Sequence, residues 1–149
     1  MKLKLKAVSP KIGRELPWPQ RATTGSAGMD LSACIEEDII ISPRQLVRIP
    51  TGIAIALPGP EYVALVYARS GLGIKHGIAL SNGVGVIDSD YRGEIRVGLT
   101  NLSDTAYTVA PGDRIAQLAV MPVVQAQLEV CDSLDETERG QGGFGSTGK

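Results

Sequence analysis

Short stretches in which apolar and polar residues alternate constrain the fold of this chain more than any other feature. Leu3, Leu5 and Ala7 alternate with three lysines over residues 2–7. The same period of two recurs over 94–99 and over 124–130. Successive side chains of an extended strand point to opposite faces. Each stretch therefore predicts a half-exposed β-strand.

Glycine and proline divide the rest of the chain into pieces too short for long helices. The 149 residues include 18 glycines and 9 prolines, and both residue types interrupt helices. Turn residues separate the remaining apolar runs, which cover 39–41, 46–49, 53–57, 62–67 and 115–121. Strands at a spacing of roughly 8–12 residues are typical of an all-β sandwich or closed barrel. We also expect one short helix near 72–75.

Length and charge favour a single domain that binds neither nucleic acid nor membrane. We place this domain at 1–138 and a glycine-rich C-terminal arm at 139–149. The 15 basic and 16 acidic side chains give a net charge of −1, whereas nucleic-acid binding needs a strongly basic surface. No apolar run approaches the roughly 18 residues of a membrane span, and lysines interrupt the N-terminal apolar positions of any signal peptide. We therefore expect a cytoplasmic protein.

The cysteines and the histidine argue against several kinds of site. Cys34 and Cys131 lack metal-ligand spacing, and in a reducing cytoplasm we expect them as two small core thiols. His76 is the single histidine, so a histidine-based triad or a histidine-rich metal site would depend on it alone.

Three glycine-containing segments interrupt the strand pattern, and loops of this kind carry binding chemistry. The first, 69–77, follows an apolar strand and begins with Arg69, Ser70 and Gly71. A guanidinium, a hydroxyl and unhindered backbone amides suit phosphate oxygens. The alternative is an ordinary strand-to-turn connection.

The second segment, 81–93, predicts a β-hairpin with Asp88 at its inner end. A carboxylate of reference pKa about 3.9 is ionised at neutral pH and can act as a base toward water. The alternative is that Asp88 and Asp90 are ordinary turn residues.

The third segment, 139–149, combines glycines with Arg139, Ser146 and the single phenylalanine, Phe144. Such an arm could close on a ligand, with the ring stacked on a base and the polar groups on phosphate. The alternative is a disordered tail. Together the three segments predict a ligand with several negative charges and one flat ring, which is a nucleotide.

Five ordered motifs resemble those of the trimeric dUTP diphosphatase (dUTPase) family. They cover nearly the whole chain, at 27–33, 69–71, 85–94, 112–117 and 139–148. Ala68 stands where the family usually has proline, which changes backbone stiffness but removes no functional group.

The resemblance implies a jelly-roll-like distorted β-barrel and a homotrimer with active sites shared between subunits. It implies hydrolysis of dUTP to dUMP and pyrophosphate, which limits uracil incorporation into DNA and supplies dUMP for thymidylate synthesis. Asp88 matches the general base that activates water for attack on the α-phosphorus. Mg²⁺ would be held mainly by the phosphates and water rather than by a protein cage.

The resemblance also assigns the substrate contacts. Arg69, Ser70 and Gly71 match the phosphate-binding loop, and Gln117 matches a further phosphate contact. Asn82 and the backbone of Val86 and Ile87 match the uracil-reading hairpin. Tyr91 matches the ring under the deoxyribose. Further contacts fall on Arg96 and on the closing arm, at Arg139, Phe144 and Ser146. For Asp30, in the first motif, an orienting role and a direct role both remain open, and so does an indirect role toward the metal.

Two other functions fit parts of the pattern. A dCTP deaminase shares the barrel and binds a similar nucleotide, but it uses a glutamate proton shuttle and lacks this arm. A non-catalytic nucleotide-binding trimer would have no need of an intact Asp88.

Overall fold

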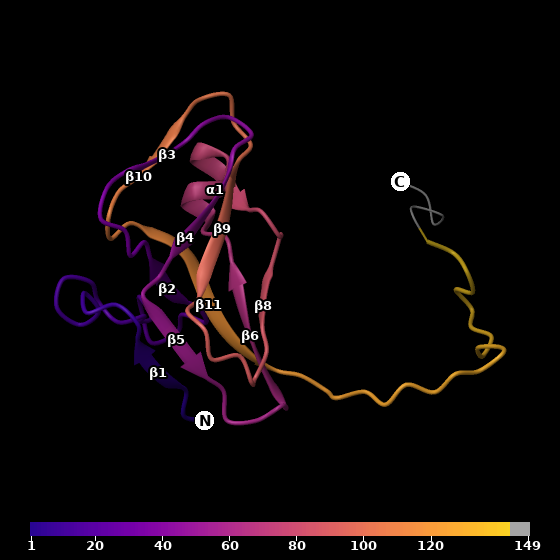
Figure 1. Cartoon of the computed structure of the whole chain (residues 1–149). Helices are drawn as coiled ribbons and strands as arrows, with labels where there is room; N and C mark the ends of the chain where they lie inside the picture. The colour runs from indigo at the N-terminus through magenta and orange to yellow at the C-terminus, as the bar shows by residue number, and fades with distance from the viewer. Residues whose placement is uncertain (144–149) are drawn as a thin grey trace.

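The computed structural model describes residues 1–143 and shows a β-rich body (Figure 1). Within the described residues the elements are β1 (Lys4–Ala7), β2 (Met29–Ser32), β3 (Ile39–Ile41), β4 (Leu46–Pro50), β5 (Ile53–Ala56), β6 (Tyr62–Tyr67), α1 (Ser70–His76), β7 (Ile78–Leu80), β8 (Gly85–Ile87), β9 (Arg96–Asn101), β10 (Tyr107–Val109) and β11 (Arg114–Pro122). The prediction of a mostly β fold with one short helix is confirmed, and the helix is longer than expected.

Antiparallel pairing joins the strands into small sheets that wrap around one core. The strand orders are β1-β5, β10-β3, β2-β11-β6-β8 and β4-β9-β7. Long β11 pairs with both β2 and β6, which brings segments far apart in the sequence together. β8 pairs with β6 and forms the edge of the largest sheet. The predicted hairpin over 81–93 is therefore wrong, because β8 pairs with β6 and not with the strand that follows it, β9. β8 is instead an edge strand.

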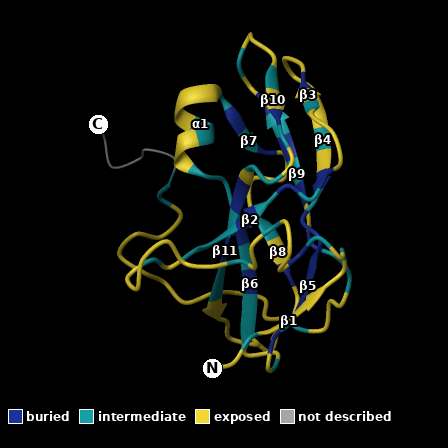
Figure 2. Ribbon diagram, turned by 90° about the vertical axis from the view of Figure 1, so that its left-hand side faces the viewer, coloured by how far each residue is buried: buried dark blue, intermediate teal, exposed yellow. Residues whose placement is uncertain are grey.

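Isoleucine, leucine, valine and alanine make up the buried cluster at the core. Figure 2 shows buried stretches on most of the strands. Along β9 the alternation has the predicted form, because Val97 and Leu99 are buried while Arg96 is exposed. β9 thus carries Arg96 on its outer face, and its buried side chains fix the strand to the core.

Helix α1 begins at Ser70, four residues beyond Val66, the last buried residue of β6, and it ends at His76. Gly77 has φ of 66° and closes the helix in the left-handed conformation that glycine adopts most easily. β6 and α1 together hold Arg69 at the junction between a strand and a helix.

The predicted strand over 124–130 is absent, and that prediction is wrong for the single chain. After β11 the chain leaves the barrel (Figure 1), and Val124, Leu128 and Val130 are 86%, 96% and 98% exposed. A strand needs a partner edge for its backbone, and within residues 1–143 this segment runs beside none. Alternation predicts an apolar face but does not say what covers it.

The two cysteines are both free thiols. Cys34 is partly buried, whereas Cys131 lies in the exposed segment after β11. The prediction of Cys131 as a core residue is therefore wrong, for the same reason as the strand around it. Of the helices in residues 1–143, none has the length and apolar character needed to cross a membrane.

Candidate active site

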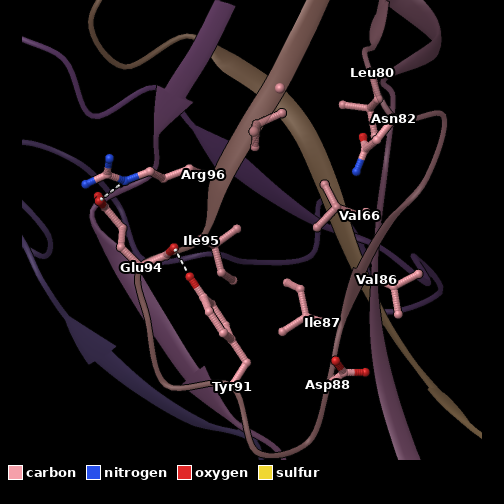
Figure 3. A pocket seen from close by; sticks show the side chains of 13 residues that line it. Val66, Leu80, Asn82, Val86, Ile87, Asp88, Tyr91, Glu94, Ile95 and Arg96 are labelled. Atoms are coloured by element: carbon pink, nitrogen blue, oxygen red, sulfur yellow. Dashed lines mark hydrogen bonds and ion pairs between the residues drawn. The ribbon is translucent and has the colours of Figure 1, made fainter.

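A small cavity lies between the edge strand β8 and the start of β9 (Figure 3). Its volume is about 240 Å³, below the roughly 300–1,000 Å³ of pockets that hold drug-sized ligands. The lining residues are Val66, Leu80, Asn82, Gly85, Val86, Ile87, Asp88, Tyr91, Glu94, Ile95, Arg96, Val97 and Gly98. The cavity therefore has room for one small group, and its lining combines apolar side chains with polar ones.

Asn82 comes before β8 and Asp88 directly after it, so the two residues lie on either side of Val86 and Ile87 (Figure 3). Ile87 is buried and fixes the strand to the core, while the Val86 side chain is 64% exposed. A Cβ at Gly85 would lie 3.1 Å from the Cβ of Val66 on β6, so glycine allows the close approach of the two strands. Away from β6, the backbone of β8 is available to a ligand.

Asp88 is exposed at the end of β8, in a turn that its neighbours hold in place. The Tyr91 N–H donates to the Asp88 carbonyl at 3.2 Å. Nη1 of Arg92 donates to the carbonyls of Ser89 and Tyr91 at 2.7 and 2.9 Å. The carboxylate is therefore accessible to solvent, and hydrogen bonds within the turn fix the backbone that carries it. A base that acts on water needs both.

Tyr91, Glu94 and Arg96 form the other wall of the cavity (Figure 3). The Tyr91 hydroxyl donates to the Glu94 carbonyl at 3.0 Å, and Arg96 Nε lies 2.9 Å from a Glu94 carboxylate oxygen. Sequence reasoning gave Glu94 no role, although it lies in the third motif between two predicted site residues.

A second cluster of charged groups surrounds Asp30 on β2. One carboxylate oxygen of Asp30 lies 3.1 Å from Arg69 Nε and the other lies 3.0 Å from Arg114 Nη1. Arg69 also donates through Nη1 to the Arg114 carbonyl at 3.0 Å. Asp30 thus holds two guanidinium groups side by side. Arg114, at the start of β11, was not predicted as a site residue, and its place in the fourth motif was the available signal.

The other predicted phosphate contacts lie beside this cluster. Ser70 and Gly71 open helix α1 and are exposed, and a Cβ at Gly71 would meet nothing within 4 Å. Gln117 lies opposite both Asp30 and Tyr67 in the sheet and donates to the Ala68 carbonyl at 3.0 Å. Nearby, burial raises the pKa of the Tyr107 hydroxyl, and the Asp113 carboxylate acts in the same direction. This end of the molecule therefore gathers cations and neutral donors.

Asp88 and the Asp30 cluster lie toward opposite ends of β6, although Val66, near the Arg69 end of this strand, also lines the cavity. Ile87 pairs with Ala64, so Asp88 lies beside Val63, six residues before Arg69. At about 3.3 Å per residue, Asp88 and Arg69 of one chain are about 20 Å apart. One chain does not bring all the predicted site residues together.

The arm residues contact neither cluster in the described part of the chain. Arg139 is exposed and its Nε donates to the Gly142 carbonyl at 2.8 Å. Phe144 and Ser146, the other two predicted arm contacts, lie outside the described residues.

Comparison with known proteins places this geometry in a family. Residues 14–148 match the dUTPase family. A deoxyuridine 5'-triphosphate nucleotidohydrolase of Ectopseudomonas mendocina is 53% identical over 146 residues, 98% of this chain and 97% of the relative. One of Idiomarina loihiensis is 51% identical over 147 residues, 99% and 97% of the two chains. The structure of Staphylococcus bacteriophage 80alpha dUTPase with dUpNHpp is similar at a TM-score of 0.86 and 26% identity, covering 99% of each chain.

The fold and these relatives define a hydrolase built on a distorted, jelly-roll-like β-barrel, as the resemblance implied. The chain belongs to the dUTPase family.

Proposed function

We propose that this protein hydrolyses dUTP to dUMP and pyrophosphate, with Asp88 as the general base. The observation that carries the proposal is the exposed Asp88 carboxylate at one end of a small cavity that an edge strand lines. The names of the relatives, and dUpNHpp with the phage enzyme, support dUTP as the substrate. The product dUMP would then supply thymidylate synthesis, and removal of dUTP would limit uracil in DNA.

The edge strand β8 suits recognition of uracil. The ring offers an N–H between two carbonyls, and a strand edge offers alternating backbone donors and acceptors. Cytosine would place like groups opposite one another, which leaves buried polar groups unpaired. Asn82, at the far end of the strand from Asp88, would add a side-chain contact to the base.

Tyr91 would lie under the deoxyribose. Its ring lines the cavity and is 46% exposed, so one face is available to a sugar. A 2′-hydroxyl would clash with that ring. Arg96, on the same wall, would add a positive charge near the phosphates.

The cluster around Asp30 would bind the phosphates. Arg69, with Ser70 and the exposed backbone at Gly71, offers bidentate and hydroxyl donors to phosphate oxygens, and Gln117 lies beside them. Asp30 already accepts from Arg69 and Arg114, so its role here is to orient these guanidinium groups. A carboxylate in direct contact with phosphate would instead repel it.

In the chemical step a water oxygen bonds to the α-phosphorus as the bond from that phosphorus to the bridging oxygen breaks. The water proton passes to the Asp88 carboxylate, and the bond electrons leave with pyrophosphate. Asp88 orients the water, while the guanidinium groups offset charge on the phosphate oxygens.

The donor set of this chain fits Mg²⁺ that arrives with the nucleotide. Residues 1–143 contain no group of three or more histidine, cysteine, aspartate or glutamate side chains placed to hold a metal. Mg²⁺ prefers phosphate oxygens and water with at most one or two carboxylates. When bound, it would offset charge on the leaving pyrophosphate.

The site would be completed by three copies of the chain. Asp88 and Arg69 of one copy are too far apart to act on one α-phosphorus, whereas two copies can bring opposite ends of β6 together. The exposed apolar residues over 124–130 also need a cover that residues 1–143 of one chain do not provide. In this arrangement 1–138 forms the barrel domain of each subunit, and 139–149, with Arg139, Phe144 and Ser146, closes over a neighbour's site.

The substitution Asp88→Asn tests the proposal, because it keeps the size and polarity of the side chain but removes the base. We expect dUTP affinity to stay within about tenfold of the wild type, while turnover falls at least about 100-fold, the typical contribution of a general base. Asp90→Asn, an exposed carboxylate in the same turn, is the matched control and should keep wild-type turnover. Full turnover in Asp88→Asn would show that Asp88 is not the base.

A further inference from the structure

The ring of Tyr91 rests on a residue that has no side chain. A Cβ built at Gly93 would lie 2.6 Å from Cζ and 3.0 Å from Cε2 of Tyr91, and would also overlap the hydroxyl. Side chains do not approach a Cβ this closely, so any residue other than glycine at 93 would displace the ring.

The backbone of Gly93 gives no other reason for glycine. The φ of Gly93 lies outside the left-handed region, whereas Gly83, before β8, has a φ of 72°. An alanine at 93 would therefore be compatible with the backbone conformation, and the space under the Tyr91 ring is what the glycine provides.

The ring is also held from its far end. The Tyr91 hydroxyl donates to the Glu94 carbonyl at 3.0 Å. The Glu94 side chain, only 15% exposed, accepts from the Gly52 N–H at 3.0 Å through one oxygen and pairs with Arg96 Nε at 2.9 Å through the other. The carbonyl that fixes the ring is thus anchored to the turn between β4 and β5.

We propose that Gly93 and Glu94 are positioning residues that set where the Tyr91 ring lies in the nucleotide cavity. Gly93 leaves the space beneath the ring, and Glu94 holds its hydroxyl. Tyr91 and Glu94 line the cavity but Gly93 does not, so a side chain at 93 pushes the ring toward the sugar. The inference rests on the proposed function, because the sugar of dUTP is the group that the ring meets.

A double-mutant cycle between positions 91 and 93 tests the proposal. We expect Gly93→Ala to raise the KM for dUTP about fivefold to tenfold, the effect of one lost contact, with kcat within about threefold. In a Tyr91→Ala background, which has no ring to displace, Gly93→Ala should change KM less than about twofold. Equal effects of Gly93→Ala in both backgrounds would overturn the proposal.

Gly25→Ala is the matched control, because a Cβ there would meet nothing within 4 Å and its φ needs no glycine. It should leave KM and kcat unchanged.

The role of Glu94 is tested by comparing the variants Glu94→Ala and Glu94→Gln. The amide oxygen of glutamine can still accept from the Gly52 N–H, so Glu94→Gln should recover most of the KM that Glu94→Ala loses. A glutamine variant as impaired as the alanine variant would exclude this positioning role for Glu94.

A crystal structure of Gly93→Ala separates failure of this inference from failure of the proposed function. A displaced Tyr91 ring supports the positioning role even in a protein that acts on a different nucleotide. A ring in the wild-type place overturns it, even if the wild-type protein releases pyrophosphate from dUTP.

Discussion

Single charged residues decide where the proposed phosphate-binding groups of this protein lie. Asp30 accepts from two guanidinium groups through separate oxygens, and the side chains of Asp30 and Arg69 are only 24% and 26% exposed. Partial burial makes such a pair more effective than one at the surface. The sequence placed Asp30 in a motif but left its role open, and the pair with Arg114 settles what it contacts.

We predict that Asp30→Asn raises the KM for dUTP about tenfold, because a neutral amide holds Arg69 less firmly than a carboxylate does. Steady-state kinetics measure this. Glu36→Gln is the control, since it breaks the exposed pair with Lys11, in which the distance is 2.6 Å and the Glu36 side chain is 82% exposed. If both variants bind dUTP like the wild type, Asp30 does not orient the phosphate site.

Residue types and order in the motifs predicted much of the candidate site, but not its internal contacts. Asp88, Asn82 and Tyr91 meet around one cavity. The roles of Glu94 and Arg114 could not be predicted, because their partners are backbone groups and carboxylates that only the folded chain brings near. The local sequence shows which side chains are present, but it does not show which of them come into contact in the folded chain.

At the scale of elements, alternation predicted both the position and the burial of β9. It predicted β1 as a strand, but all four residues of β1 are exposed, so the expected buried face is missing there. It failed at the C-terminal segment. Along β9 the period of two matches burial because core and solvent lie on its two faces. Over 124–130 the same pattern belongs to a segment that has no strand partner among the described residues of its own chain. Alternation indicates that one face of a segment is apolar. It does not indicate whether the same chain or another molecule covers that face.

We predict that Leu128→Asp weakens assembly into trimers and leaves the barrel folded. Leu128 is 96% exposed in the single chain, so the charge disturbs no contact within it, but it would place a carboxylate in an apolar interface. Sedimentation measures the mass and circular dichroism the fold. Ile40→Asp, at an exposed apolar residue of β3, is the control and should assemble normally. Unchanged assembly of Leu128→Asp would show that this face does not pack against another copy.

At the scale of the whole molecule, Asp88 and Arg69 of one chain lie about 20 Å apart along the direction of β6. The fold of one chain therefore explains how the surroundings of Asp88 and of Arg69 are each built, and in the proposed trimer two subunits bring them together. The sequence alone could predict a shared site only through its resemblance to a trimeric family, because no local pattern reports the distance between Asp88 and Arg69.

We predict that deleting residues 139–149 leaves the assembly intact and greatly lowers turnover. The arm would supply Arg139, Phe144 and Ser146 to close a site on another subunit, and closure excludes water and completes the phosphate contacts. Sedimentation and pyrophosphate release are measured on the same preparation. A truncated protein that no longer assembles would show instead that the arm is structural.

The central claim, hydrolysis of dUTP, is tested most directly by product release from a panel of nucleotides with Mg²⁺ present. The panel is the four ordinary deoxynucleoside triphosphates, dUTP and UTP, with pyrophosphate and ammonia measured in each. We predict pyrophosphate from dUTP, little from the others and no ammonia. Ammonia from dCTP without pyrophosphate from dUTP would identify a deaminase, and binding of dUTP without any product would identify a non-catalytic trimer, so either result would contradict the proposed function.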